Sequence, residues 1–391
     1  MHSYYSLCPY APDNSGRILV AGCDLEHKWG QVYILDSDGY VLDTFGSQRI
    51  GTSFYHTGLW QAWGPNGNSV YYSAGGGDVK HPRVAVRELD TGREYIMDGD
   101  MEGAPYFGEP IFHGLHGMLY AAGYGDGHYY PEESPVPFQN RDEHGIFSTS
   151  PHTGKKELQL SVNDILKIHP DRIRIENEDM RLKEKYGDKS GLTLMAYCVR
   201  YTRDGERLMF YFGNHCVDKN RGEPKITYIF TADKDLNNLQ LALDLSFDKT
   251  GVHWSWHSDN ERLIGYGPKP DGADKEICLA TVQRDGSEYT AISNHHSGGH
   301  PSISPINYNL AVTDESVDGR GYVLFLDTRS GEIIQKVELP KYNLENGDIP
   351  KGRNPYWICH HPVFNRDGSK VLCNILPGRY SSLCELEVPI L

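Results

Sequence analysis

The chain has 391 residues and a formal net charge of −15, and its basic residues form no stripe or cluster. Nucleic acid is not an expected partner, because binding to phosphates requires a basic surface. No apolar run approaches the roughly 18 residues that a membrane helix needs, so we expect no membrane partner either.

The N-terminus, Met-His-Ser-Tyr-Tyr, has no basic region followed by an apolar stretch. This favours a cytoplasmic location, or a periplasmic or secreted one if a leader peptide has been removed. The eight cysteines are spread thinly and form no CxxC pair. We therefore expect them to be reduced and mostly buried.

An eight-residue phrase recurs along the chain: an apolar stretch that ends in a tight turn, with a second β-rich run after it. Such a phrase predicts an inner strand, a turn and a second strand. The clear copies are WQAWGPNG at 60–67, CVRYTRDG at 198–205 and HPVFNRDG at 361–368, and looser copies lie at 253–260 and 300–307.

A second phrase follows several copies: a strand, an Asp-rich turn that ends in Gly, and another strand. It occurs around 36–39, 90–92 and 327–331. Four antiparallel strands in a unit of about 45 residues are typical of a propeller blade. We therefore predict an all-β, seven-bladed β-propeller, with blades that begin near Tyr4, Phe54, Phe107, Thr193, Gly251, Gly298 and Trp357.

The third blade has the weakest copy of the repeat, at 110–117, and a charged segment follows it. Residues 162–191 have a helical composition and do not fit the strand pattern. We predict that they form a small helical insertion between blades three and four, within a single propeller domain that spans 1–391.

Inner strands of a propeller begin at one face, and the loops between second and third strands return to it. His253, His300 and His361 share the first position of the phrase in three successive blades. Three imidazoles at equivalent places could bind one divalent ion, such as manganese, iron or zinc, with calcium as a further alternative. Each histidine could instead bond its own blade, and Cys359, His360 and His257 are weaker candidate ligands.

Further polar side chains are expected at the same mouth. A long loop follows the apolar run at 119–123, carries Tyr129 and Tyr130, and extends to Arg141; long loops in compact repeats are often functional. Strand alternation turns Arg200 the same way as Cys198. The remaining candidates are three loop histidines, one histidine before an inner strand and one strand-ending amide: His27, His81, His215, His56 and Asn214.

These residue types suit an elimination reaction better than an ordinary hydrolysis. Most glycosidases need two carboxylates beside the scissile bond, and no such pair is evident. A lyase that acts on a uronic acid needs a cation to neutralise the carboxylate, a base for the C5 proton and an acid for the leaving oxygen. Histidine, tyrosine and arginine can perform those tasks.

Several stretches resemble blades of one propeller clan: FYHTGLWQAW at 54–63, GGHPSISP at 298–305 with VTD at 312–314, and HPVFNRDG at 361–368. The clan holds the oligogalacturonate lyases, the propeller ulvan lyases and the lyases that cleave rhamnose from glucuronic acid. A sister family is described as α-L-rhamnosidases that act on the same bond. The resemblance covers nearly the whole chain at the level of its repeats.

The resemblance implies roles for particular residues. Two histidines in and just after the second blade match His56 and His81, and a tyrosine in the third blade's loop matches Tyr129 or Tyr130. These four would be the catalytic acid and base.

Substrate and metal ligands follow in the same way. Arginines that hold the uronate match Arg141 and Arg200. The oligogalacturonate lyases also place a manganese ion among histidines of the late blades, which His300 and His361 resemble. Whether such an ion is catalytic or structural stays open.

Three functions remain open. The first is β-elimination at a uronate in an acidic oligosaccharide, at a rhamnose–glucuronate linkage above all. The second is an α-L-rhamnosidase that hydrolyses that linkage through a histidine. The third is a non-catalytic propeller that binds sugar or protein.

Overall fold

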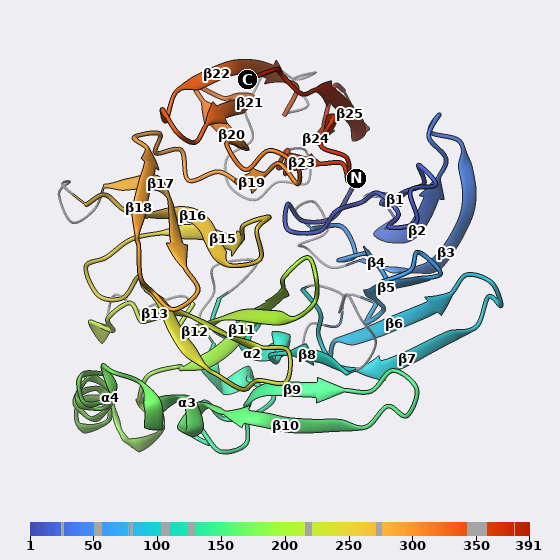
Figure 1. The fold of residues 1–391 in the computed structure, drawn as a ribbon. Helices are drawn as coiled ribbons and strands as arrows, with labels where there is room; N and C mark the ends of the chain where they lie inside the picture. Colours follow the sequence, from blue (N-terminus) through green and yellow to red (C-terminus); the bar gives the residue numbers. More distant parts are fainter. Residues whose placement is uncertain are drawn as a thin grey trace.

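Seven antiparallel sheets follow one another along the chain, and they surround a common centre in the computed structural model of the protein (Figure 1). The structure describes residues 1–24, 27–50, 57–76, 78, 81–102, 110–123, 130–215, 221–270, 276–341, 358–378 and 380–391. The predicted seven-bladed β-propeller is confirmed.

Each blade is built from one continuous stretch of chain. Blades one to three contain β1 (Ile18–Asp24), β2 (Trp29–Leu35) and β3 (Val41–Arg49); β4 (Ala62–Trp63), β5 (Ser69–Ser73), β6 (Arg83–Glu88) and β7 (Glu94–Asp98); and β8 (Ile111–His113), β9 (Gly145–Thr149) and β10 (Lys156–Ser161). Blades four and five contain β11 (Met195–Tyr201), β12 (Arg207–Gly213), β13 (Thr227–Asp233) and β14 (Gln240–Asp244); and β15 (Val252–Trp256), β16 (Arg262–Pro268), β17 (Ile277–Gln283) and β18 (Thr290–Ser293). Blades six and seven contain β19 (Ser302–Ile303), β20 (Leu310–Val317), β21 (Arg320–Asp327) and β22 (Ile333–Leu339); and β23 (Val363–Phe364), β24 (Lys370–Ile375) and β25 (Ser382–Glu387).

Strand β12 shows why the blades stack. Successive side chains of a strand point to opposite faces of its sheet. Phe210 and Phe212 enter the core on the side of blade three, whereas Met209 and Tyr211 enter the core shared with blade five. A strand between two blades is therefore apolar on both faces, which produces the continuous run LMFYF.

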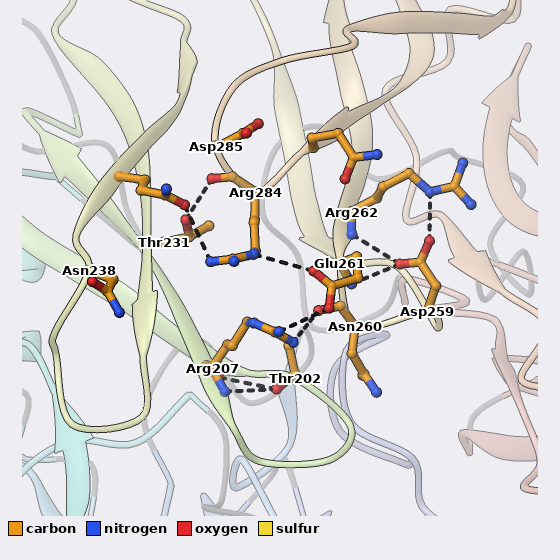
Figure 2. A network of polar contacts seen from close by, with 12 residues as sticks. Thr202, Arg207, Thr231, Asn238, Asp259, Asn260, Glu261, Arg262, Arg284 and Asp285 are labelled. Carbon is orange, nitrogen blue, oxygen red and sulfur yellow. Dashed lines mark hydrogen bonds and ion pairs between the residues drawn. The ribbon is translucent and has the colours of Figure 1, made fainter.

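Polar contacts link blades four and five at their turns (Figure 2). Glu261, in the turn before β16, accepts hydrogen bonds from Arg207 of β12 at 2.9 Å and from Arg284 at 3.3 Å. The hydroxyl of Thr231 in β13 donates to the main-chain carbonyl of Arg284 at 2.7 Å. Asp259 holds Arg262 at 2.6 Å beside them. These contacts fix the two blades relative to each other.

The first residues of the chain join blade one to blade seven. The ammonium of Met1 donates to the carbonyl of Ala21 in β1 at 2.7 Å. The next amide, of His2, donates to the side-chain oxygen of Asn374 in β24 at 2.8 Å. Figure 1 shows the N-terminus beside β1 and β24, so this short segment closes the ring.

Blades one, three and seven have three strands each within the described residues. Blade three also contains a helix, because the apolar run near 119–123 forms part of α2 (His116–Ala121), not a strand. All six residues of α2 are buried, and Met118 and Leu119 pack against Met195 and Tyr197 of blade four. A segment that is apolar all round fits a buried helix, whereas a half-buried strand needs an alternating pattern.

The charged segment forms helices, as predicted. Its elements are α3 (Val162–Ile168), α4 (Arg172–Tyr186) and the 3-10 turn η2 (Asp188–Ser190), and a further 3-10 turn, η1 (Pro131–Glu133), precedes β9. Ser161 and Asp164 form a reciprocal capping box that starts α3. No helix in the described part of the chain is long and apolar enough to cross a membrane.

A buried ion pair attaches α4 to the propeller. Asp179 of α4 accepts a hydrogen bond from Arg141 at 2.6 Å, and the two side chains are only 5% and 10% exposed. The same carboxylate binds Lys183 at 2.8 Å and the amide of Leu192 at 2.7 Å. Four charged or polar groups thus converge on one position.

We expect Asp179→Asn to lower the free energy of unfolding by about 3–5 kcal/mol, because Arg141 would keep its buried charge without a counter-charge. Denaturant titration measures this loss. The matched control is Glu176→Gln, which removes the exposed partner of Arg172 on the same helix and should cost no more than about 0.5 kcal/mol. Equal effects of the two changes would contradict the assignment.

Two buried histidines near the insertion predict acid sensitivity. Burial lowers the pKa of His144 and of His169 from 6.5 to about 4. The unfolded chain therefore takes up protons first as the pH falls, and stability is lost between about pH 6.5 and pH 4. Because the ring nitrogen of His169 accepts the amide hydrogen of Asp171 at 3.0 Å, an Asn at position 169 can retain that bond.

We expect His169→Asn to flatten the decline of unfolding free energy between pH 6.5 and 4. Denaturant titrations at a series of pH values measure the slope. An unchanged slope in the variant would show that this imidazole does not carry the effect.

Candidate functional site

The first position of the eight-residue phrase has an unusual backbone conformation. Trp60, Cys198, His253 and His361 occupy it in blades two, four, five and seven, with φ angles of 54°, 55°, 56° and 46°. Strand register slips at this position in blades four and five, as in a β-bulge. Left-handed backbone at residues other than glycine is strained and is concentrated at functional sites.

The three histidines of this position meet at the centre of the molecule. The ring centroids of His253 and His300 are 4.1 Å apart, and those of His300 and His361 are 4.2 Å apart. His300 and His361 are buried, and His253 is half-buried. The structure thus brings together the three residues that the sequence proposed as metal ligands.

Two tyrosines from the N-terminal segment pack against these imidazoles. The Tyr4 ring lies 4.8 Å from that of His361 and 5.2 Å from the Trp60 ring. The Tyr5 ring lies 5.2 Å from that of His300. Both tyrosines are buried, so the cluster has an aromatic wall on this side.

Hydrogen bonds fix the orientation of all three rings. Nδ1 of His253 lies 2.7 Å from the carbonyl oxygen of Gly298, and Nδ1 of His361 lies 3.2 Å from that of Ser3. Nδ1 of His300 lies 2.9 Å from a carboxylate oxygen of Asp314. Since these oxygens only accept, each Nδ1 carries the hydrogen and each Nε2 is the basic nitrogen. Metal-binding histidines have this outer-shell arrangement.

The charges of the cluster are set by burial and by its partners. Burial lowers the pKa of His253 to about 3, so its imidazole is neutral near neutral pH. Burial alone would raise the pKa of Asp314, but the adjacent His300 holds it well below its ordinary value. Asp314 is therefore an ionised acceptor for the Nδ1 hydrogen of His300.

One group of side chains in the described part of the chain has the spacing of a metal site. The ligand atoms of His300, Cys359 and His361 all lie within 4.8 Å of one another, and all three residues are buried. His253 stands beside this group and is not one of its members. Two basic imidazole nitrogens and a sulfur fit a divalent transition metal.

Arg200 is a buried cation that contacts the two tyrosines of the aromatic wall. Its guanidinium donates to the hydroxyl of Tyr5 at 3.3 Å and to the carbonyl of Trp254. It also lies 5.1 Å from the Tyr4 ring and 5.8 Å from the Tyr211 ring. Arg200 is buried, so its charge acts in a low-dielectric environment shared with the histidines.

A small pocket adjoins Arg200 on the side of blade three. Asp100, Glu102, His116 and Cys198 line it. Burial raises the pKa of Glu102, although the positive charge of Arg200 opposes this. Asp100 binds His116 at 3.0 Å. A buried carboxyl group with a raised pKa can donate a proton, which makes Glu102 a chemically competent residue that the sequence alone did not indicate.

Other predicted residues lie outside this cluster. His27 and His81 have side chains that are 74% and 78% exposed, and each pairs with an aspartate three residues earlier, Asp24 or Asp78. Tyr130 is half-buried at the start of η1. His56 and Tyr129 lie outside the described residues.

Three predicted substrate ligands have structural partners. Arg141 is bound to Asp179 in the buried ion pair of α4, so its guanidinium is committed to the insertion. Asn214 is buried and binds Glu223 at 2.9 Å and the amide of Ile226 at 2.7 Å, so its side chain is held by the residues just before β13. His215 is half-buried, with its ring 6.0 Å from that of Tyr197.

Three residues of the cluster, Tyr4, Tyr5 and Asp314, were missing from the predicted set, and so was Glu102 of the adjoining pocket. Tyr4 and Tyr5 come just before the first blade, and no repeat copy marks them. Asp314 lies within β20, and it is opposite His300 only because β19 pairs with β20. Cys359 was a weaker candidate metal ligand in the sequence, where its position two residues before His361 placed it close to a predicted ligand.

Comparisons with known proteins support the fold. No protein-family model matches the chain, and no curated protein matches its sequence. An oligogalacturonate lyase in complex with manganese aligns with a TM-score of 0.59 and 12% identity, over 99% of this chain and 90% of that one. An oligogalacturonate lyase from Vibrio parahaemolyticus aligns with a TM-score of 0.55 and 14% identity, over the same shares. A prolyl endopeptidase structure aligns with a TM-score of 0.54 and 10% identity, over 99% of this chain and 51% of that one.

Proposed function

We propose that the protein cleaves a uronate-containing oligosaccharide by β-elimination, at a rhamnose–glucuronate or related linkage. The observation that carries this proposal is the convergence of His253, His300 and His361 beside the buried guanidinium of Arg200. The fold shared with two oligogalacturonate lyases is consistent with it.

In this proposal a divalent ion, such as manganese, zinc or calcium, binds at His300 and His361. Their basic Nε2 atoms and the Asp314 carboxylate behind His300 fit such an ion. When bound, the ion neutralises the substrate carboxylate and makes the neighbouring C5 proton more acidic. Arg200 would bind the same carboxylate, because its buried charge is little screened.

The protein's own residues then move the protons. The Nδ1 hydrogen of His253 is held by the carbonyl of Gly298, so Nε2 is the nitrogen that would accept the C5 proton. Burial raises the pKa of Tyr5 to about 12, so its hydroxyl stays protonated and donates to the leaving oxygen. The alternative acid and base are the loop residues His56, His81, Tyr129 and Tyr130.

We expect His253→Asn to lower kcat about 100- to 10,000-fold, the range for loss of a general base. Asn is chosen because it tolerates the left-handed backbone at this position. The measurement is the rise in ultraviolet absorbance of the unsaturated uronate, on oligogalacturonate, ulvan and gum arabic oligosaccharides.

The controls for that experiment separate the two candidate sites. His169→Asn alters a buried histidine of the insertion, where Nδ1 also accepts a main-chain amide, and should leave the rate unchanged. His81→Asn alters the exposed alternative. If His81→Asn abolishes elimination and His253→Asn does not, the chemistry belongs to the loops and the central assignment is wrong.

We expect Asp314→Asn to weaken divalent metal binding about 10- to 100-fold, because the His300 ring loses its charged acceptor. Titration against a competing chelator measures the affinity. The control is Glu315→Gln, since that neighbouring carboxylate binds His295 and Lys336. Unchanged affinity in Asp314→Asn would remove His300 from the metal site.

A second candidate is hydrolysis of the same linkage with release of rhamnose. The buried Glu102, with its raised pKa, favours it because such a carboxyl group can protonate a leaving oxygen. Product mass decides between the two reactions, since hydrolysis adds one water and elimination adds none. If the protein binds these oligosaccharides but converts none of them, it is a carbohydrate-binding propeller, and both the elimination and the hydrolysis proposals are wrong.

A further inference from the structure

We propose that Cys359 is a thiolate ligand of the ion that His300 and His361 bind, and that this makes the site one for a softer ion, zinc above all, than manganese. This inference rests on the ion of the proposed function and deepens it. It departs from the similar structure that contains manganese.

The position of Cys359 carries the first step. Its sulfur and one ring nitrogen from each of His300 and His361 lie within 4.8 Å of one another. A tetrahedral zinc ion with bonds of about 2.0–2.3 Å separates its ligand atoms by about 3.5 Å. Small rotations of three side chains therefore bring all three atoms onto one ion.

The two imidazoles are already oriented for such an ion. The Nδ1 hydrogen of His300 is held by Asp314, and that of His361 is held by the carbonyl of Ser3. Both rings therefore turn their basic Nε2 atoms away from these partners. The outer shell is supplied by β20 and by the N-terminal segment, so it depends on the closed ring of blades.

Among the cysteines that the structure describes, only Cys359 belongs to such a group. Cys373 is fully buried in β24 of the same blade, within an apolar cluster. Cys198 occupies the first position of the phrase in blade four but interacts with Glu102. Burial of a thiol is therefore common in this protein, whereas its placement beside two oriented imidazoles is not.

The chemistry of sulfur determines the kind of ion. Thiolates select zinc and other soft ions, whereas manganese prefers carboxylate, carbonyl and water oxygen. Binding breaks the S–H bond of Cys359, forms a sulfur–metal bond and releases the proton to solvent. The thiolate then offsets one of the ion's two positive charges inside a buried site.

Cobalt(II) is the probe for the sulfur ligand. Co²⁺ replaces zinc in such sites, and a thiolate ligand adds an intense near-ultraviolet charge-transfer band that nitrogen and oxygen ligands do not give. We expect this band in the wild-type protein titrated with Co²⁺. We expect it to vanish in Cys359→Ser and to persist in Cys373→Ser, the matched buried thiol of the same blade.

Zinc and manganese affinities provide a second measurement. Nearly any site with such ligands binds Zn²⁺ more tightly than Mn²⁺, so a preference for zinc does not by itself identify a sulfur ligand. The test is whether Cys359→Ser changes the ratio of the Zn²⁺ affinity to the Mn²⁺ affinity. We expect Cys359→Ser to weaken Zn²⁺ binding more than about 100-fold, beyond the loss for an outer-shell change. Mn²⁺ binding should change less than about 10-fold, on the same grounds.

Two outcomes would overturn the inference. One is wild-type protein that binds Co²⁺ without a thiolate band, a result that does not depend on any variant folding. The other is Cys359→Ser protein with an unaltered ratio of zinc to manganese affinity.

Neither measurement uses enzymatic activity. If the protein is an active lyase but shows no thiolate band, the proposed function stands and this inference is wrong. If it shows the thiolate band but eliminates no substrate, this inference stands and the proposed function is wrong.

Discussion

The centre of this molecule depends on a left-handed backbone conformation at the first position of its repeat. Each such residue other than glycine carries strain of order 1–3 kcal/mol, and four blades accept it, at Trp60, Cys198, His253 and His361. In a regular strand, successive side chains alternate between the two neighbouring blades. In blades four and five the strand register slips at this position and interrupts that alternation, and the ring of His253 lies beside that of His300 of blade six.

Burial then determines the chemistry of the side chains that meet there. Burial keeps the imidazole of His253 neutral, and in a neutral imidazole a fixed hydrogen-bond acceptor decides which nitrogen is basic. The carbonyl of Gly298, the carboxylate of Asp314 and the carbonyl of Ser3 make the same choice for all three rings. Three equivalent positions thereby present similarly oriented imidazoles, and Asp314 adds a negative charge behind His300.

The polar residues away from the axis mainly hold blades and the insertion in place. Glu261 of blade five binds Arg207 of blade four, and Asp179 attaches α4 through Arg141. In both cases a long cationic side chain satisfies a carboxylate across a boundary between elements. Arg141 illustrates the consequence for function. Its place in a long loop predicted that it would bind substrate, but in the structure it forms a buried ion pair with Asp179.

The sequence by itself determined the seven blades and the shared position of the three histidines, because a local phrase repeats along the chain. It also determined the helical insertion, because a charged segment interrupts that repeat. It did not determine helix α2, since a fully apolar segment fits either a buried strand or a buried helix. It also missed Tyr4, Tyr5 and Asp314, because closure of the ring and pairing of β19 with β20 bring them beside the histidines from distant parts of the chain. It missed Glu102 as well, because only the folded structure buries this carboxyl group near Arg200. Only the tertiary structure decides such meetings, because they depend on which backbone groups close the ring, and no local pattern records that.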